Sequence, residues 1–178
     1  MENQIYKLTS GLIRMKPLTL FLVTTLPLLF KFSMPATEAY VFINKLMMSI
    51  GSIILFAWVY AVGCKSNDKL LSEGISVDIF KYFNWVAALS ILFYILTMFA
   101  TTEVITNKSG MQFRFATPVY LPIICMLAFI ATLLIAAKML VSAEQNKEAK
   151  FDDYCNTFLL FMIASIGLWF IQPRVQKL

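Results

Sequence analysis

Histidine is absent from this 178-residue chain, and cysteine is scarce. Without imidazole the chain cannot build His-containing zinc sites, Ser-His-Asp triads or His-ligated haem. The three cysteines, Cys64, Cys125 and Cys155, form no CxxC pair, so the usual dithiol redox motif is missing, and their odd number does not imply a full disulfide framework. The sequence therefore predicts no catalytic residue, no cofactor-binding residue, no metal ligand set and no enzyme.

Charge is also scarce. Charged residues make up 14% of the chain, against roughly a quarter in soluble domains, while hydrophobic residues make up 60%. The ten Asp and Glu residues fall in connections or at the ends of apolar runs, so the intramembrane carboxylate of a proton-coupled small exporter is missing. The 15 Lys and Arg residues lie between the runs, which is typical of topology signals in membrane proteins and argues against nucleic-acid binding.

Long apolar runs fill most of the chain and predict an all-α membrane protein, a four-transmembrane-helix bundle in a single domain, 1–178. The helices are expected near 17–34, 40–63, 79–100 and 118–143, with no β-sheet. Residues 64–78 and 101–117 are expected to be polar connections, and the fourth helix is expected to project two or three turns beyond the membrane. A cleaved signal peptide is the alternative for the first run, although Lys31 directly after it argues against that interpretation.

A fifth apolar run, 157–171, is expected to be a short C-terminal helix. Fifteen helical residues reach about 22 Å, less than a hydrocarbon core of about 30 Å, and Pro173 is expected to end the helix. With four spans, 11 Lys and Arg residues lie inside and 4 outside; with five spans the numbers are 9 and 6. The sequence thus favours cytoplasmic termini and a helix that turns back and packs on the others; five spans is the alternative.

Three stretches together resemble a known group of proteins. They are Trp58–Gly63, Ala136–Leu140 and the tail Ile166–Lys177, with the sequence IGLWFIQPRVQK. They are similar to uncharacterised small four-helix integral membrane proteins of Bacteroidota-type bacteria, in which a tail like IGxWxIQPRIN follows four helices. One departure is Ser165, where the group usually has proline. The resemblance implies a bacterial cytoplasmic (inner) membrane and a multi-pass architecture, and it transfers no catalytic residue.

Five polar or aromatic residues are candidates for interaction or anchoring. Lys45 lies shallow in the second run, where snorkelling to the surface is the competing explanation. Asn84 is expected to hydrogen-bond to another helix. Trp169 is expected at the membrane interface. Gln172 and Arg174 flank the proline of the tail, and Arg174 is expected to pair with lipid phosphate or with one of the carboxylates at 152 and 153.

These features predict a small membrane protein that acts by interaction, as an accessory subunit, an immunity-type protein or a self-associating bundle. The alternative is a channel or carrier for a small or apolar molecule, which needs no titratable group. The expected partners are the lipid bilayer and another membrane protein or a second copy of the chain, with no nucleic acid and no cofactor.

Overall fold

The fold is helical, apart from one small hairpin. The structure is a computed structural model that describes residues 10–30, 38–75, 79–99, 102–107, 110–115 and 120–178. A short helical segment at 10–14 precedes the named elements. These are α2 (Pro17–Phe30), α3 (Glu38–Ser72), α4 (Ile79–Phe99), β1 (Thr102–Asn107), β2 (Gly110–Phe115), α5 (Tyr120–Gln145), α6 (Phe151–Met162) and α7 (Ala164–Lys177).

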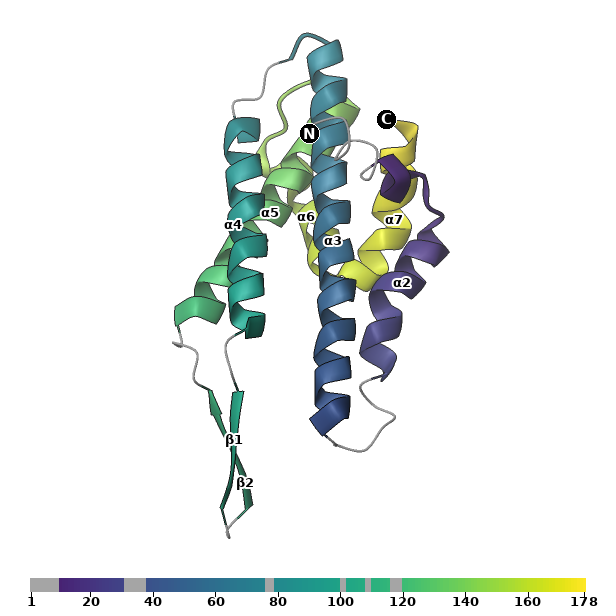
Figure 1. The fold of residues 1–178 in the computed structure, drawn as a ribbon. Helices are drawn as coiled ribbons and strands as arrows, with labels where there is room; N and C mark the ends of the chain where they lie inside the picture. The colour runs from purple at the N-terminus through teal and green to yellow at the C-terminus, as the bar shows by residue number, and fades with distance from the viewer. Residues whose placement is uncertain (1–9, 31–37, 76–78, 100–101, 108–109, 116–119) are drawn as a thin grey trace.

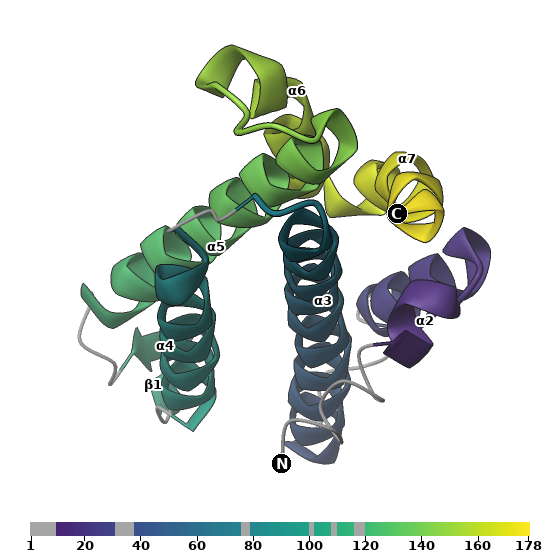
Figure 2. The same ribbon diagram turned by 90° about the horizontal axis from the view of Figure 1, so that it is seen from above.

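The longest helix, α3, lies at the centre of the helices. Seen from above, α4 and α5 lie on one side of α3, and α2 and α7 lie on the other (Figures 1 and 2). The buried apolar side chains concentrate where α3, α5 and α7 meet, with Trp58, Leu140 and Ile171 fully buried there. The end of the molecule that carries the C-terminus is therefore tightly packed.

Three helices are long and apolar enough to cross a membrane within the described part of the chain. The qualifying segments are Ser49–Ser72, Ile79–Thr97 and Tyr120–Gln145. The sequence prediction of long apolar helices at these places is confirmed. The first predicted span is represented by the 14 residues of α2, and its expected continuation to residue 34 lies outside the described residues.

Helix α3 differs from the sequence prediction because it continues to Ser72 rather than ending near residue 63. Gly63 does not end the helix; instead, it lets the Phe83 ring of α4 approach so closely that any Cβ at this position would overlap it. The polar residues that follow are not a solvated connection either, because Ser66 and Asn67 are buried and the Ser66 hydroxyl donates to the Val62 carbonyl at 2.8 Å.

The connection between α4 and α5 corrects the prediction of a chain without β-sheet. Strands β1 and β2 pair in antiparallel register, with Thr102 opposite Phe115 and Asn107 opposite Gly110. The segment is long enough to pair with itself on both sides of the predicted turn, and its β-branched and aromatic residues favour a strand. The central residues of the predicted Asn-Lys-Ser-Gly turn lie outside the described residues.

Helix α5 ends earlier than the sequence suggests. It stops at Gln145, and Asn146 adopts a left-handed conformation with φ 49°. The Lys147 N–H donates to the Ser142 carbonyl at 3.2 Å, which is the six-to-one hydrogen bond of a Schellman cap. This cap ends the helix one turn after the apolar run, so the predicted extension of two or three turns is wrong.

The C-terminal apolar run is a helical hairpin rather than a single helix. Helices α6 and α7 meet at Ile163, whose φ of −95° and ψ of 63° break the helix. Gly167 permits the sharp turn, because a Cβ there would collide with the Leu160 carbonyl. The hairpin returns α7 to the end of the molecule where α5 ends (Figure 1).

Proline at position 173 does not end the helix as predicted, since α7 continues to Lys177. Proline removes one intrahelical hydrogen bond and usually kinks or ends a helix. Here the last turn is held from outside α7: the Lys65 ammonium donates to the Val175 carbonyl at 2.8 Å, and Gln176 donates to the carbonyls of Ile13 and Met15. Tertiary contacts thus compensate for the lost bond.

Candidate functional site

A buried amide joins three distant parts of the chain at the C-terminal end of α7. Gln172 is fully buried, and its Oε1 accepts a hydrogen bond of 2.6 Å from Trp58 Nε1 on α3. Its Nε2 donates to the carbonyls of Ile13 at 2.7 Å, Met15 at 3.0 Å and Leu12 at 3.1 Å. We call this set of five residues the Gln172 junction. It fixes the segment before α2 to both α3 and α7.

The guanidinium of Arg174 ties α7 to α5. Its Nε and Nη2 donate to the two carboxylate oxygens of Glu144 at 2.7 and 2.5 Å, and its Nη1 donates to Thr157 Oγ1 at 3.1 Å. Two parallel charge-assisted hydrogen bonds make this a well-oriented pair. The expected partners at 152 and 153 are replaced by Glu144, because Asp153 instead accepts the Lys150 N–H and caps α6.

The contact between Lys65 and Val175 decides on which side α7 ends. The Lys65 Nζ atom lies 2.8 Å from the Val175 carbonyl, next to Arg174 in sequence. A fifth helix crossing the whole apolar slab would place Arg174 at the opposite end of the molecule from Lys65. The contact therefore shows that α7 ends at the same end of the molecule as Lys65.

The remaining candidate residues are spread over the molecule. Asn84 on α4 accepts a hydrogen bond of 3.2 Å from the Tyr60 hydroxyl of α3, so it links two helices. Trp169 is partly exposed, with its ring centroid 6.0 Å from that of Phe21 on α2. Lys45 lies in α3, and its side chain is outside what the structure describes. The structure therefore groups Gln172 and Arg174 at one end and leaves Asn84 and Trp169 apart from them.

The α5–α6 connection carries an exposed ion pair. Lys138 Nζ lies 2.7 Å from Glu148 Oε1, and the Ser142 hydroxyl accepts the Ala149 N–H at 2.9 Å. The hydrogen bond and charge of Lys138 lower the pKa of the Glu148 carboxyl below its usual value. This ion pair holds the connection against α5.

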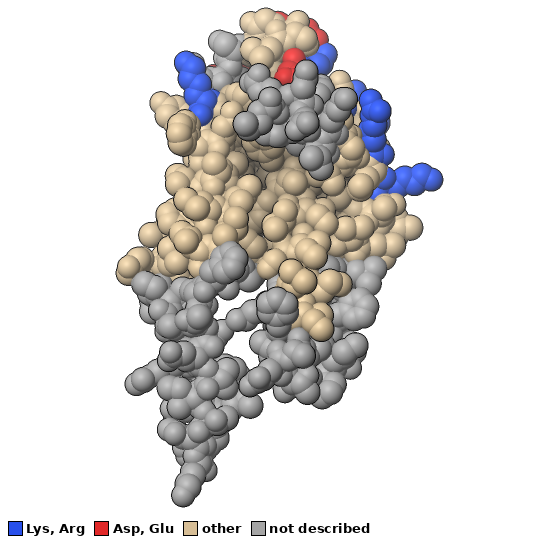
Figure 3. Space-filling model, in the orientation of Figure 1, with Lys and Arg blue, Asp and Glu red and all other residues tan. Residues whose placement is uncertain are grey.

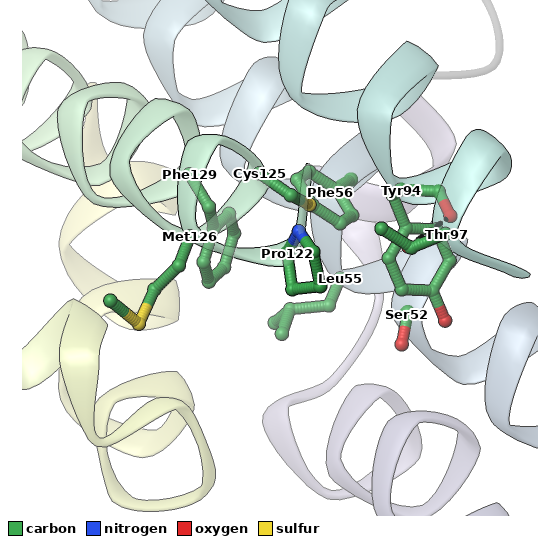
Figure 4. Close-up of a pocket in the computed structure, with 9 residues that line it drawn as sticks. All are labelled: Ser52, Leu55, Phe56, Tyr94, Thr97, Pro122, Cys125, Met126 and Phe129. Carbon is green, nitrogen blue, oxygen red and sulfur yellow. Dashed lines mark hydrogen bonds between the residues drawn. The ribbon is translucent and has the colours of Figure 1, made fainter. Parts of the chain in front are cut away.

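A cavity lies between α3, α4 and α5, away from the Gln172 junction. It has a volume of about 290 Å³ and is lined by nine mostly apolar residues (Figure 4). Phe56 of α3 packs between Tyr94 of α4 and Phe129 of α5, with ring centroids 5.7 and 4.7 Å apart. The Tyr94 hydroxyl is the one buried side-chain polar atom that has no hydrogen-bond partner among the described residues.

The described residues contain no candidate metal site. No group of three or more His, Cys, Asp or Glu side chains that could hold a metal ion occurs within the described residues. The polar groups at the Gln172 junction bond to one another, and the cavity offers hydroxyl groups in an apolar wall.

Comparison with known proteins does not assign the chain to a family. No family model, no curated protein and no solved structure matches this chain. Any functional assignment therefore depends on the geometry described above.

Sequence reasoning missed Trp58, Glu144 and Tyr94 as members of these sites. The one available signal was chemical: Gln172 and Arg174 are polar residues in an apolar tail, and buried polar groups need partners. That signal identifies the two residues but does not say which distant residues complete their hydrogen bonds.

Proposed function

We propose that this chain is a multi-pass membrane protein with four spans and a C-terminal helical hairpin that does not cross the bilayer. The apolar length of α3, α4 and α5 supports three of the spans, and the fourth is proposed for the apolar run that contains the 14 residues of α2. Helix α7 returns to the level of Lys65, which supports the non-crossing hairpin.

The distribution of basic residues supports cytoplasmic termini. Most described Lys and Arg residues lie before α2, towards the end of α3, at the start of α4, towards the end of α5 and after it, and at the end of α7; the exceptions are Lys45 near the start of α3 and Arg114 in β2. In Figure 3 the basic side chains of the visible face lie in its upper part, above the uncharged described surface. Basic residues favour the cytoplasmic side. Together with the resemblance of the tail, this orientation points to a bacterial inner membrane.

Cysteine labelling in intact cells tests this topology. The three native cysteines are replaced, and single cysteines are introduced at Ser109 and Ser72, because Ser66 nearby is fully buried and would not react. An impermeant maleimide should label position 109 in intact cells and position 72 only after permeabilisation. The reverse pattern overturns the orientation, and equal labelling of both positions overturns α4 as a span.

The proposed activity is interaction with another membrane helix, in the first instance that of a second copy. The observation that carries it is a stripe along α4. Only 17% of the apolar window of α4 is buried, against 44% in α3 and 39% in α5. Its exposed large residues include a series at alternating steps of three and four: Tyr82, Trp85, Leu89, Leu92 and Leu96.

Apolar residues spaced by three and four positions form the contact line between two helices that cross at a small left-handed angle. The five residues of this series, the α4 stripe, therefore indicate packing against a partner helix, because contact with lipid requires no regular spacing. A second copy offers the same stripe, and a two-fold interface between identical patches is the commonest form of self-association. An accessory or immunity-type role uses the same stripe with a different membrane protein.

Site-specific photocrosslinking distinguishes these outcomes. A photoreactive amino acid is placed at Leu92 on the stripe and, as a control, at Leu127, which is similarly exposed on α5. A crosslinked dimer at position 92 supports self-association, and a crosslink to another protein, identified by mass spectrometry, supports an accessory role. Crosslinks to lipid alone at both positions overturn the interaction proposal.

A channel or carrier for a small apolar molecule is the second candidate, because the cavity between α3, α4 and α5 offers a binding volume in the apolar region. Purified chain in liposomes should then accelerate transmembrane flux of a small apolar dye. Flux equal to that of protein-free liposomes contradicts this candidate.

A further inference from the structure

The hairpin of α6 and α7 carries no charged residue between Asp153 and Arg174. Its inner side is buried against the other helices, with Phe161, Leu168 and Ile171 almost completely inaccessible. Near the turn its outer side is exposed and also apolar. We call the exposed large apolar residues there the hairpin tip: Leu159, Met162, Ile163, Ile166, Trp169 and Phe170. A helix in contact with water turns polar residues outward, so the hairpin tip lacks the surface that water requires.

The hairpin tip lies away from the end of the molecule where α7 ends. The ring of Phe161, beside the turn, contacts that of Trp58 on α3, with the centroids 5.5 Å apart. Trp58 precedes Lys65 by seven residues in the same helix, which is about 10 Å. In Figure 1 the turn between α6 and α7 lies beside the middle part of α3, whereas the C-terminus lies towards the C-terminal end of α3. The turn is therefore about 10 Å from the level of Lys65, next to which α7 ends.

A contact with α2 gives a similar depth. The ring centroids of Trp169 and Phe21 are 6.0 Å apart. Phe21 is five residues beyond Lys16, which lies directly before α2, and five helical residues span about 8 Å. In a bilayer with a core about 30 Å thick and with Lys16 and Lys65 at one boundary, the hairpin tip therefore lies between that boundary and the midplane.

The turn keeps backbone hydrogen bonds on both sides of Ile163. The Ile163 N–H donates to the Leu159 carbonyl at 3.1 Å, and the Ile163 carbonyl accepts the N–H groups of Ile166 at 2.9 Å and Gly167 at 2.8 Å. Inside a bilayer no water is available to satisfy such groups, so a turn at that depth needs internal partners. The break between α6 and α7 is therefore compatible with apolar surroundings.

We propose that the hairpin tip inserts among the acyl chains of one leaflet, on the side of the membrane where α7 ends, and does not enter the opposite leaflet. Acyl chains match a surface that is apolar and uncharged. The charged residues at the two ends of the hairpin, Asp152 and Asp153 in α6 and Arg174 and Lys177 in α7, then lie near the headgroups. The proposal rests on the proposed membrane spans and does not depend on their orientation.

Spin labelling measures the depth of the tip. The native cysteines of the full chain are replaced, and one label is attached through Ile163→Cys or, as a control, through Phe151→Cys; these side chains are 53% and 57% exposed on the same hairpin. In phospholipid vesicles the label collides with oxygen, which concentrates in hydrocarbon, and with a water-soluble nickel chelate. The ratio of oxygen to nickel collisions should be several-fold higher at position 163, equivalent to a depth about 10 Å greater, since twelve helical residues span about 18 Å. Ile166→Cys should give a similar depth.

Two results at position 163 would overturn the insertion. A depth equal to that at position 151 would show that the hairpin lies flat at the surface, and low collision with both reagents would show that a second copy of the chain covers the tip. A label at Leu127, which is exposed on α5, separates this failure from that of the spans. A deep label at 127 with a shallow one at 163 overturns the insertion alone, whereas shallow labels at both positions overturn the proposed spans as well.

Discussion

Replacement of Gln172 by leucine tests whether the Gln172 junction stabilises the fold. Leucine has a similar length and suits a buried position, so the main change is the loss of the amide. The carbonyls of Ile13 and Met15 keep hydrogen bonds from Gln176, whose Nε2 lies 3.0 and 3.1 Å from them. The group that loses its partner entirely is the indole N–H of Trp58.

The loss of unfolding free energy in Gln172→Leu can be worked out from these hydrogen bonds. A buried donor left without a partner destabilises by about 1–3 kcal/mol, and each lost hydrogen bond removes about 0.5–1.5 kcal/mol. Since the remaining carbonyls keep partners and leucine adds apolar contact, we expect Gln172→Leu to lower the free energy of unfolding by about 2–4 kcal/mol. Gln176→Leu, the same change one turn later, should cost about 1 kcal/mol or less, because Gln172 still serves both of its acceptors.

Reversible unfolding of the full chain in mixed detergent–SDS micelles, followed by far-UV circular dichroism, measures both values. A double-mutant cycle with Trp58→Phe isolates the pair, since phenylalanine removes the indole N–H. The effect of Gln172→Leu should be smaller by about 1–2 kcal/mol in that background. Additive effects, or a Gln172→Leu variant within about 0.5 kcal/mol of the parent, would refute the reasoning.

Three further outcomes follow from other contacts. Gly167→Ala should lower the free energy of unfolding by about 1–3 kcal/mol through a backbone clash, whereas Gly11→Ala, with open space around its Cα, should be near neutral; equal effects would contradict the clash. Arg174→Lys keeps the charge but loses the two-pronged hydrogen bond, so a loss of about 1 kcal/mol is expected in the same assay, and a variant as stable as the parent would contradict it. Because the pKa of Glu148 is lowered by its ion pair, its stabilising effect should be present at neutral pH and lost as pH falls through that lowered pKa. The difference in melting temperature between the parent and Glu148→Gln should therefore shrink on acidification, and a pH-independent difference would contradict this.

The positions of the three long apolar helices could be predicted from the sequence because the length of an uninterrupted apolar run indicates a helix. The charge between runs also predicts that the C-terminal run does not span the membrane, and this stays a prediction. The helix ends were less predictable. In the sequence, Gly63 looks like a residue that ends a helix. In the structure the helix continues, and the missing Cβ instead leaves room for the Phe83 ring, a contact that the sequence does not reveal.

The site was predictable only in part, for a related reason. Gln172 and Arg174 stand out in an apolar tail, whereas Trp58 lies 114 positions from Gln172 and Glu144 lies 30 positions from Arg174. No spacing rule connects residues so far apart, because the helix crossings that bring them together depend on side-chain packing. Tyr94 was not predicted, because in the sequence a tyrosine within an apolar run looks the same whether its hydroxyl has a hydrogen-bond partner or not.

The buried polar groups of Gln172 and Tyr94 differ in whether they have hydrogen-bond partners, and this difference predicts different effects of substitution. At the Gln172 junction the buried amide and indole satisfy each other, so the region is complete without a ligand. On α4 the buried Tyr94 hydroxyl has no partner among the described residues, so it contributes no hydrogen bond to the folded state. Substitutions of the two residues should therefore have opposite effects on stability. Gln172→Leu should lower the free energy of unfolding, whereas Tyr94→Phe should leave it unchanged or raise it, because it removes a buried hydroxyl without a partner; a loss of about 1 kcal/mol or more in Tyr94→Phe would contradict this.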